Sequence, residues 1–248
     1  MTRRAARRPR RRVSVVGVLG ELFITAGVVM LLYVAWQLWI GDIIYGAERN
    51  AQGTELSQQW EQTDPQPPSL ATDPTTGQEV FVPPVIAEPA DAEVFGVMRV
   101  PRWGDDYAMP MAGGVSRPRT LDPIGIGHYP GTEMPGEVGN FALAGHRTTF
   151  GKPFADIASL RVGDAIVVET EEGWFTYRFR TLEYVQPDEV DVLLDVPQAP
   201  DVPANERYIT LTTCSPRYSL AERIVAYGIF ESFQPRAEGE PASLTEGI

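Results

Sequence analysis

Cysteine and histidine are scarce in this sequence. Its 248 residues contain one cysteine, Cys214, and two histidines, His128 and His146. A single cysteine excludes the intramolecular disulfide framework that stabilises many small secreted domains. No cluster of cysteine, histidine and acidic residues has the spacing of metal ligands, so neither a metal ion nor an organic cofactor is predicted. Any catalytic chemistry must therefore depend on very few side chains.

Helical periodicity is also scarce after residue 92, and no internal repeat is visible. Short β-type runs separated by turn signals fill residues 93–233, with single helical turns expected only near residues 114–119 and 154–160. The segment Glu171-Glu172-Gly173 is a strong hairpin signal between two of these runs. Seven or eight short strands in about 140 residues predict an all-β domain, either a small barrel or a sandwich.

Positive charge is scarce outside the first residues. The formal net charge is −12, yet residues 1–12 carry seven arginines and no acid, which leaves −19 on the remainder. Nucleic-acid binding requires a basic face. The acidic remainder therefore argues against nucleic acid as a partner.

The one long apolar run extends from Val13 to Ile40. Its last 19 residues, from Leu22 onward, carry no formal charge and are about enough to cross a ~30 Å hydrocarbon core. A cleaved signal peptide and a buried core helix are the alternatives, but the run exceeds the roughly 7–15 apolar residues of a signal peptide. We predict a transmembrane helix over residues 13–41 behind a basic cytoplasmic tail, residues 1–12. Arginines mark the inner side, so we expect a single-pass protein of the cell membrane with its N-terminus in the cytoplasm and all later residues extracellular.

Two further segments have a composition typical of unfolded chain. Residues 42–92 are rich in Gln, Thr, Asp and Pro and are predicted to form a flexible, Pro-rich extracellular linker. Within them, a helical start over residues 47–60 and an apolar patch at residues 80–82 are the exceptions. Residues 234–248 are predicted to be a disordered tail. The folded domain is thus expected over residues 93–233.

Cys214 ends a β-type run that begins at Tyr208, and Pro216 follows it without an N–H to continue a ladder. A second β-type run begins at Arg223. If the two runs pair as an antiparallel hairpin, the thiol lies beside the guanidinium. An unpaired extracellular cysteine indicates a reactive thiol, and a guanidinium can stabilise the oxyanion of acyl transfer. The alternatives are a small buried hydrophobic cysteine and an arginine paired with Glu222 or another surface acid.

His146 directly follows Gly145 at the end of the strand predicted over residues 140–144. Loops at strand ends are where a rigid scaffold presents functional groups. Near neutral pH a histidine can act as general acid and base for a thiolate nucleophile. His128 lies in a segment rich in Gly and Pro, residues 125–131, and is interpreted as a loop-packing residue. No Asn or Asp stands out as an orienting partner for the imidazole.

Together these residues resemble the active-site motifs of the sortase family. Thr210-Leu211-Thr212-Thr213-Cys214 is similar to the sortase signature threonine-leucine-any-threonine-cysteine. Arg223 sits where the sortase arginine opens the next strand, and Ala144-Gly145-His146 looks like the sortase histidine segment. The resemblance extends over residues 93–233. The strings at residues 140–154 and 211–228 look most like the class E sortases of high-GC Gram-positive bacteria.

The resemblance implies a closed eight-stranded β-barrel with one or two short helices, and a cysteine transpeptidase. Cys214 is then the nucleophile that forms a thioacyl intermediate with the Thr of a C-terminal sorting signal, which is cleaved between Thr and Gly. His146 is the general acid and base, and Arg223 stabilises the substrate and the oxyanion. The implied substrate-binding residues are Thr210, Leu211 and Thr213.

The implied partners are secreted proteins with a Leu-Ala-x-Thr-Gly or Leu-Pro-x-Thr-Gly type sorting signal, and an amine of a peptidoglycan precursor. The product is then a protein attached to the cell wall. Three alternatives stay open. One is a pilus-assembling sortase, in which the acceptor amine is a pilin lysine. The others are a plain cysteine hydrolase and a non-enzymatic surface binding domain on the same barrel.

Overall fold

The structure is a computed structural model that describes residues 14–36, 41–63, 69–72 and 77–245. Its long helices are α1 (Val15–Ala35) and α2 (Gly41–Trp60). The strands are β1 (Leu70–Thr72), β2 (Glu79–Phe81), β3 (Val94–Arg99), β4 (Met109–Gly113), β5 (Ile126–His128), β6 (Gly139–Gly145), β7 (Ala165–Glu169), β8 (Gly173–Val185), β9 (Arg207–Ser215) and β10 (Glu222–Pro235). Short helical segments are η2 (Pro101–Trp103), η3 (Arg117–Leu121), η4 (Ile157–Ser159), η5 (Asp191–Leu193), η6 (Arg236–Glu238) and η7 (Ala242–Leu244).

The chain forms two compact units, Met1–Gly41 and Asp42–Ile248. Helix α1 belongs to the first, and none of its residues is buried. Its apolar side chains are exposed around the whole helix, and no polar face interrupts them. Among the described residues, α1 alone is long and apolar enough to cross a membrane.

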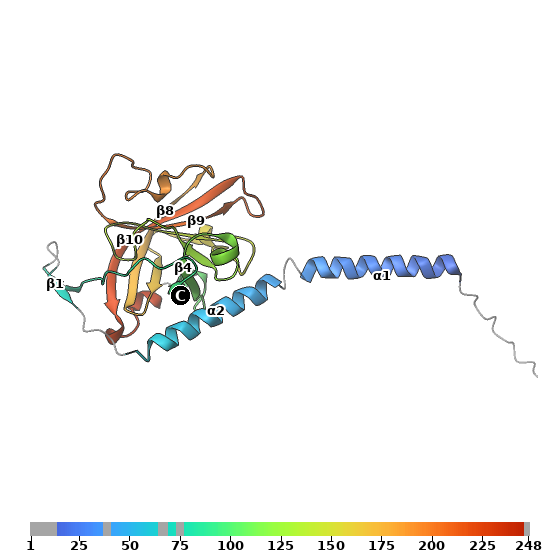
Figure 1. Cartoon of the computed structure of the whole chain (residues 1–248), viewed down its shortest axis with the longest axis horizontal. Coiled ribbons are helices and arrows are strands. Elements are labelled where there is room, and N and C mark those ends of the chain that lie inside the picture. The colour runs from blue at the N-terminus through green and yellow to red at the C-terminus, as the bar shows by residue number, and fades with distance from the viewer. Residues whose placement is uncertain (1–13, 37–40, 64–68, 73–76, 246–248) are drawn as a thin grey trace, which may run out of the picture. The chain divides into compact units, whose positions relative to one another are not determined.

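The second unit is built around a closed barrel (Figure 1). Its neighbouring strands follow the order β10-β8-β7-β3-β4-β5-β6-β9. Strands β9 and β10 pair to close it. The pairs β4–β5 and β6–β9 are parallel, and the other neighbours are antiparallel. Closure leaves no unpaired edge in the barrel sheet itself. The predicted eight-stranded closed β-barrel is therefore confirmed.

The barrel interior is filled by alternate side chains of each strand, as a period of two requires. On β9, Ile209 and Leu211 are fully buried in the main hydrophobic cluster, and on β10 Ile224 and Ala226 join them. The largest fully buried side chains are Tyr177, Phe141, Phe154, Phe175, Met98 and Met111. Residues between these positions face the outside of the barrel wall.

Strand β5 was not predicted, because glycine hides its β character in the sequence. A Cβ at Gly127 would lie 2.3 Å from the carbonyl oxygen of Gly114, so only glycine fits this close approach. His128 therefore lies on a strand and not in a loop. Its ring is fully buried, with Nε2 3.0 Å from the carbonyl oxygen of Glu133, and it stacks on Phe141. Its interpretation as a packing residue agrees with this burial.

Residues 42–60 correct the prediction of a flexible linker, because α2 is packed along the barrel (Figure 1). Its buried residues are Arg49, Gly53 and Ser57, which are four apart and share one helix face. A Cβ at Gly53 would lie 2.1 Å from the carbonyl oxygen of Ala108, so the helix backbone rests directly on the chain before β4. The side chain of Asn50 accepts a hydrogen bond from the Ala108 N–H at 2.9 Å.

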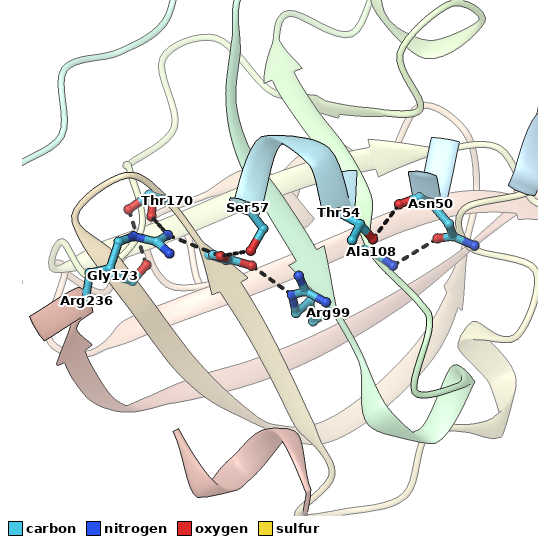
Figure 2. A network of polar contacts seen from close by, with 9 residues as sticks. Asn50, Thr54, Ser57, Arg99, Ala108, Thr170, Gly173 and Arg236 are labelled. Carbon is cyan, nitrogen blue, oxygen red and sulfur yellow. Dashed lines mark hydrogen bonds and ion pairs between the residues drawn. The ribbon is translucent and has the colours of Figure 1, made fainter. Parts of the chain in front are cut away.

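A buried carboxylate holds the second half of α2 (Figure 2). Glu169, at the end of β7, has no exposed side-chain surface and accepts a hydrogen bond from Ser57. It also forms ion pairs with Arg99 at 2.8 Å and Arg236 at 3.1 Å. The guanidinium of Arg236 lies 4.6 Å from the ring centroid of Trp174. Charge pairing, hydrogen bonding and a cation–π contact thus join α2, the barrel and the C-terminal segment.

The C-terminal segment corrects a second prediction. Residues 234–245 are not disordered: β10 continues to Pro235, and η6 and η7 follow. Ser243 is buried and shares a hydrogen bond of 3.0 Å with Thr176 of β8. Residues 246–248 of the predicted tail, and residues 64–68 and 73–76 of the predicted linker, lie outside the described residues. The side chain of Phe81 in β2 packs against the barrel core.

Candidate active site

Cys214 and Arg223 lie directly opposite each other on β9 and β10. Opposite residues of an antiparallel pair point to the same face of the sheet. Because Leu211 and Ile224 face the core, Cys214 and Arg223 face the outside of the barrel wall. The thiol is half-buried. The predicted hairpin is therefore confirmed, and its register places Cys214 and Arg223 opposite each other.

The guanidinium of Arg223 is held by backbone at the mouth of the β9–β10 loop. Its Nη1 donates to the carbonyl oxygens of Leu220 at 3.2 Å and Glu222 at 3.0 Å. The contact with Glu222 is therefore made to its backbone oxygen, which differs from the carboxylate pairing considered as an alternative. Fixed in this way, the charge can act on a ligand without first being reoriented.

His146 directly follows β6, which runs parallel to β9 with Ala144 opposite Thr212. The hydroxyl of Thr213 donates to the carbonyl oxygen of Gly145 at 2.6 Å and continues this pairing by one residue. His146 follows Gly145 and Cys214 follows Thr213, so the two residues come directly after this contact. The strand register thus brings the imidazole and the thiol to the same end of the barrel.

The ring of His146 is oriented by a carboxylate. Its Nε2 lies 2.7 Å from Oδ1 of Asp122, and both side chains are mostly buried. An ionised carboxylate only accepts hydrogen bonds, so Nε2 carries a proton and Nδ1 is left for proton transfer. Asp122 follows η3, where the chain leads toward β5. The sequence offered no signal for this partner, because Asp122 lies 24 positions before His146 and two strands, β5 and β6, lie between them.

Cys214, Arg223, His146 and Thr213 line one pocket of about 560 Å³. It contains three guanidinium groups, those of Arg117, Arg147 and Arg223, although the chain as a whole is acidic. The Arg147 Nη1 donates to the carbonyl oxygen of Cys214 at 3.3 Å. The reacting form of a cysteine is the anionic thiolate, so cations belong near it. The other lining residues are Val115, Leu121, Tyr129, Ala144, Gly145, His146, Thr148, Thr149, Thr212, Thr213, Cys214, Tyr218, Ser219 and Leu220.

The structure brings Thr213 to this pocket but not Thr210 or Leu211, and this is a correction. Leu211 is fully buried in the barrel core. Thr210 is fully buried too, and its hydroxyl donates to the side chain of Asn140 at 2.7 Å. In contrast Thr212, the variable position of the signature, lines the pocket and shares a hydrogen bond of 2.9 Å with the hydroxyl of Tyr129.

His128 is not part of the pocket. Burial lowers the pKa of its imidazole, while the hydrogen bond with the Glu133 carbonyl and the nearby charge of Glu88 oppose that shift. The ring therefore prefers the neutral form. Among the described residues, no three cysteine, histidine, aspartate or glutamate side chains gather where they could hold a metal ion.

A closed barrel that presents a thiol, an imidazole and a guanidinium in one pocket defines a protein with the elements of thiol-dependent acyl transfer. The model of the sortase domain matches residues 98–230. This match covers more than half of the chain, which therefore belongs to the sortase family. Sortases are cysteine transpeptidases.

Sequence relatives agree with this family. The chain is 36% identical over 245 residues to sortase SrtE1 of Streptomyces coelicolor, covering 96% of this chain and 64% of that protein. It is 31% identical over 232 residues to sortase SrtE2 of the same organism, covering 91% of this chain and 86% of that protein. The chain thus spans less than two thirds of the length of the first of these relatives.

Solved structures show the same barrel. The SrtA sortase from Actinomyces oris has a TM-score of 0.63 at 35% identity, covering 73% of this chain and 99% of that one. Sortase E1 from S. coelicolor, solved with a tripeptide in its active site, has a TM-score of 0.58 at 36% identity, covering 63% and 99%. The likeness to sortase E1 supports the expected similarity to class E sortases.

Proposed function

We propose that this chain is a membrane-anchored cysteine transpeptidase that cleaves a C-terminal sorting signal between Thr and Gly and transfers the acyl group to an amine. The observation that carries the proposal is the pairing of Cys214 with Arg223 in a pocket that also holds His146. Family membership supports the class of reaction. The tripeptide in the active site of the S. coelicolor relative supports a peptide as substrate.

In the first half-reaction, the thiolate of Cys214 attacks the carbonyl carbon of the substrate Thr, and a C–S bond forms. The carbonyl oxygen becomes an oxyanion beside the guanidinium of Arg223. When the oxyanion collapses, the C–N bond to Gly breaks and His146 gives a proton to the departing amine. A thioester on Cys214 remains.

In the second half-reaction, an acceptor amine attacks the thioester carbonyl and His146 removes a proton from it. The C–S bond breaks, a new amide bond forms, and the thiolate returns to its starting state. Asp122 keeps the ring of His146 in one orientation and one tautomer through both steps, because its carboxylate stays on Nε2.

The substrate is a secreted protein with a Leu-Ala-x-Thr-Gly or Leu-Pro-x-Thr-Gly type signal, and the acceptor is an amine of a peptidoglycan precursor. The product is then a protein covalently attached to the cell wall. Helix α1 has the length and composition of the anchor. The arginines before it favour a cytoplasmic N-terminus and an extracellular barrel.

The test is mass spectrometry of the products formed from a Leu-Ala-x-Thr-Gly peptide by the full chain in detergent. Acceptors are a glycine peptide, diaminopimelate, a lysine-containing peptide, or none. We expect an amide product that depends on the amine, and no cleavage by Cys214→Ala. Cleavage by Cys214→Ala refutes the nucleophile, and release of the free acid alone in every reaction identifies a hydrolase. Transfer to the lysine peptide in preference to the other amines identifies a pilus-assembling enzyme.

A further inference from the structure

Two loops hold the ring of His146, one on each side. The first contains Asp122, whose carboxylate lies 2.7 Å from Nε2. The second follows His146 itself and contains Phe150, whose ring centroid lies 5.1 Å from that of the imidazole. The position of the catalytic ring therefore depends on how firmly each loop is held in place.

The first loop is held by α2. Nη2 of Arg49 donates to the backbone carbonyl oxygen of Asp122 at 3.0 Å. Within its own loop, the amide of Asp122 donates to the carbonyl of Arg117. Both backbone groups of Asp122 are thus hydrogen-bonded. The N–H is bonded within the loop, and the carbonyl oxygen is bonded to α2, 73 positions earlier in the chain. Arg49 is buried, so water competes little for this hydrogen bond.

The second loop is held by the same half of α2. Phe150, Gly151 and Lys152 have φ values of +53°, +83° and +52°, a left-handed conformation that non-glycine residues keep only when their surroundings impose it. The first turns of α2 contact this segment at three places. A Cβ at Gly151 would lie 3.2 Å from the amide nitrogen of Gly46, so the two backbones touch. The ring of Tyr45 lies 6.5 Å from that of Phe150, and Nζ of Lys152 is 3.4 Å from Asp42.

We propose that the N-terminal half of α2, residues 42–49, is a positioning element of the active site, and that Arg49 is its principal residue. By fixing Asp122 on one side and Phe150 on the other, it sets the orientation in which His146 meets Cys214 and the substrate. The inference deepens the proposed transpeptidase function and rests on it. A segment that composition assigns to a spacer thus takes part in the chemistry.

The alternative is that α2 only packs against the barrel. Its C-terminal half supplies a matched control, because Ser57 also makes one hydrogen bond from α2 to the barrel. The acceptor is Glu169 of β7, which does not contact His146. Arg49→Met and Ser57→Ala each remove one bond between α2 and the barrel. Only the first removes a contact with the support of His146.

The experiment uses the full chain in detergent, with ¹⁵N-labelled histidine rings. The chain has two histidines, and the ring of His128 at the end of β5 is bonded locally to Thr132 and Glu133, so it is an internal reference. For Arg49→Met we expect kcat to fall by about tenfold to a hundredfold with KM unchanged, and the His146 ring resonances to move while those of His128 stay. Arg49→Lys keeps a cationic donor and restores most of kcat. Ser57→Ala leaves kcat and both histidines as in the wild type.

The inference is overturned if Arg49→Met keeps wild-type kcat or wild-type His146 resonances, or if Ser57→Ala changes them equally. If Arg49→Met does not fold, Tyr45→Ala tests the same element through Phe150, because Tyr45 is half-exposed and its loss perturbs packing little. If the wild type transfers no sorting-signal peptide to any amine, the proposed function fails. The histidine spectra still decide whether α2 positions His146.

Discussion

Glu169→Gln should destabilise the second unit strongly while leaving the pocket intact. The carboxylate of Glu169 has no exposed surface and neutralises Arg236, whose side chain is 6% exposed, and Arg99, which is 15% exposed. Glutamine has the same size but no charge, and its amide replaces one acceptor oxygen by an NH₂ group. That NH₂ then faces other hydrogen-bond donors, the guanidinium groups of Arg99 and Arg236. Arg236 is then a buried cation without a counterion.

Removing one partner of a buried ion pair costs about 3–5 kcal/mol of unfolding free energy. For a unit of this size, 1 kcal/mol shifts Tm by about 2–4 °C, so Tm should fall by about 6–20 °C. Arg236 retains hydrogen bonds to the carbonyl oxygens of Thr170 and Glu171, which places the expected loss toward the lower end of that range.

The assay is thermal unfolding of the full chain in detergent, followed by tryptophan fluorescence. Glu172→Gln is the matched control: it makes the same chemical change at an exposed acid three residues away, and surface substitutions change stability by at most about 0.5 kcal/mol. A difference in Tm of 2 °C between Glu169→Gln and the control is only about one tenth to one third of the predicted shift. A difference no larger than this would refute the buried ion pairs of Glu169 as the link between α2, β7 and the C-terminal segment.

Two further predictions concern the histidines. Asp122→Asn should lower kcat of transpeptidation by about a hundredfold or more, because an amide can present its N–H₂ to Nε2 of His146 and select the wrong tautomer. The control is Asp105→Asn, which makes the same change at an exposed acid and should keep the wild-type rate. Equal rates for the two variants would exclude the role of Asp122. The second concerns pH. Burial lowers the folded-state pKa of His128, so below about pH 6.5 the unfolded chain binds a proton that the folded chain does not, and stability falls as pH falls through that value. His128→Gln should flatten this part of the curve of Tm against pH between 7.5 and 5, and an unchanged slope would contradict the prediction.

The barrel and the thiol–guanidinium pair could be predicted because their signals are local. Strands with β-branched and aromatic residues alternate with turn signals, and a hairpin fixes which residues face each other. Cys214 and Arg223 followed from that register, and His146 from its place at a strand end. A signature motif does not say which of its residues face the core. The substrate role expected for Leu211 was wrong for this reason.

The parts that could not be predicted are held by polar contacts between distant segments. Helix α2 buries Arg49, Gly53 and Ser57, so its buried face carries no hydrophobic period for a sequence to reveal. The C-terminal segment is held through Arg236, whose partner is a single buried acid. Asp122 meets His146 because β5 pairs with β6, and β5 itself was hidden by glycine. Folded segments were predicted from their apolar content, and segments that are held by polar contacts have little apolar content to detect.

The packing of α2 also shortens the tether of the enzyme. A flexible linker over residues 42–92 would have a root-mean-square span of about 40 Å and would let the barrel sample a wide volume. With α2 packed against the barrel, the chain between the end of α1 at Ala35 and the start of α2 at Gly41 is six peptide steps, at most about 20 Å when fully extended. Under the proposed anchoring by α1, so short a connection leaves the Cys214 pocket a smaller volume to sample than a flexible linker over residues 42–92 would.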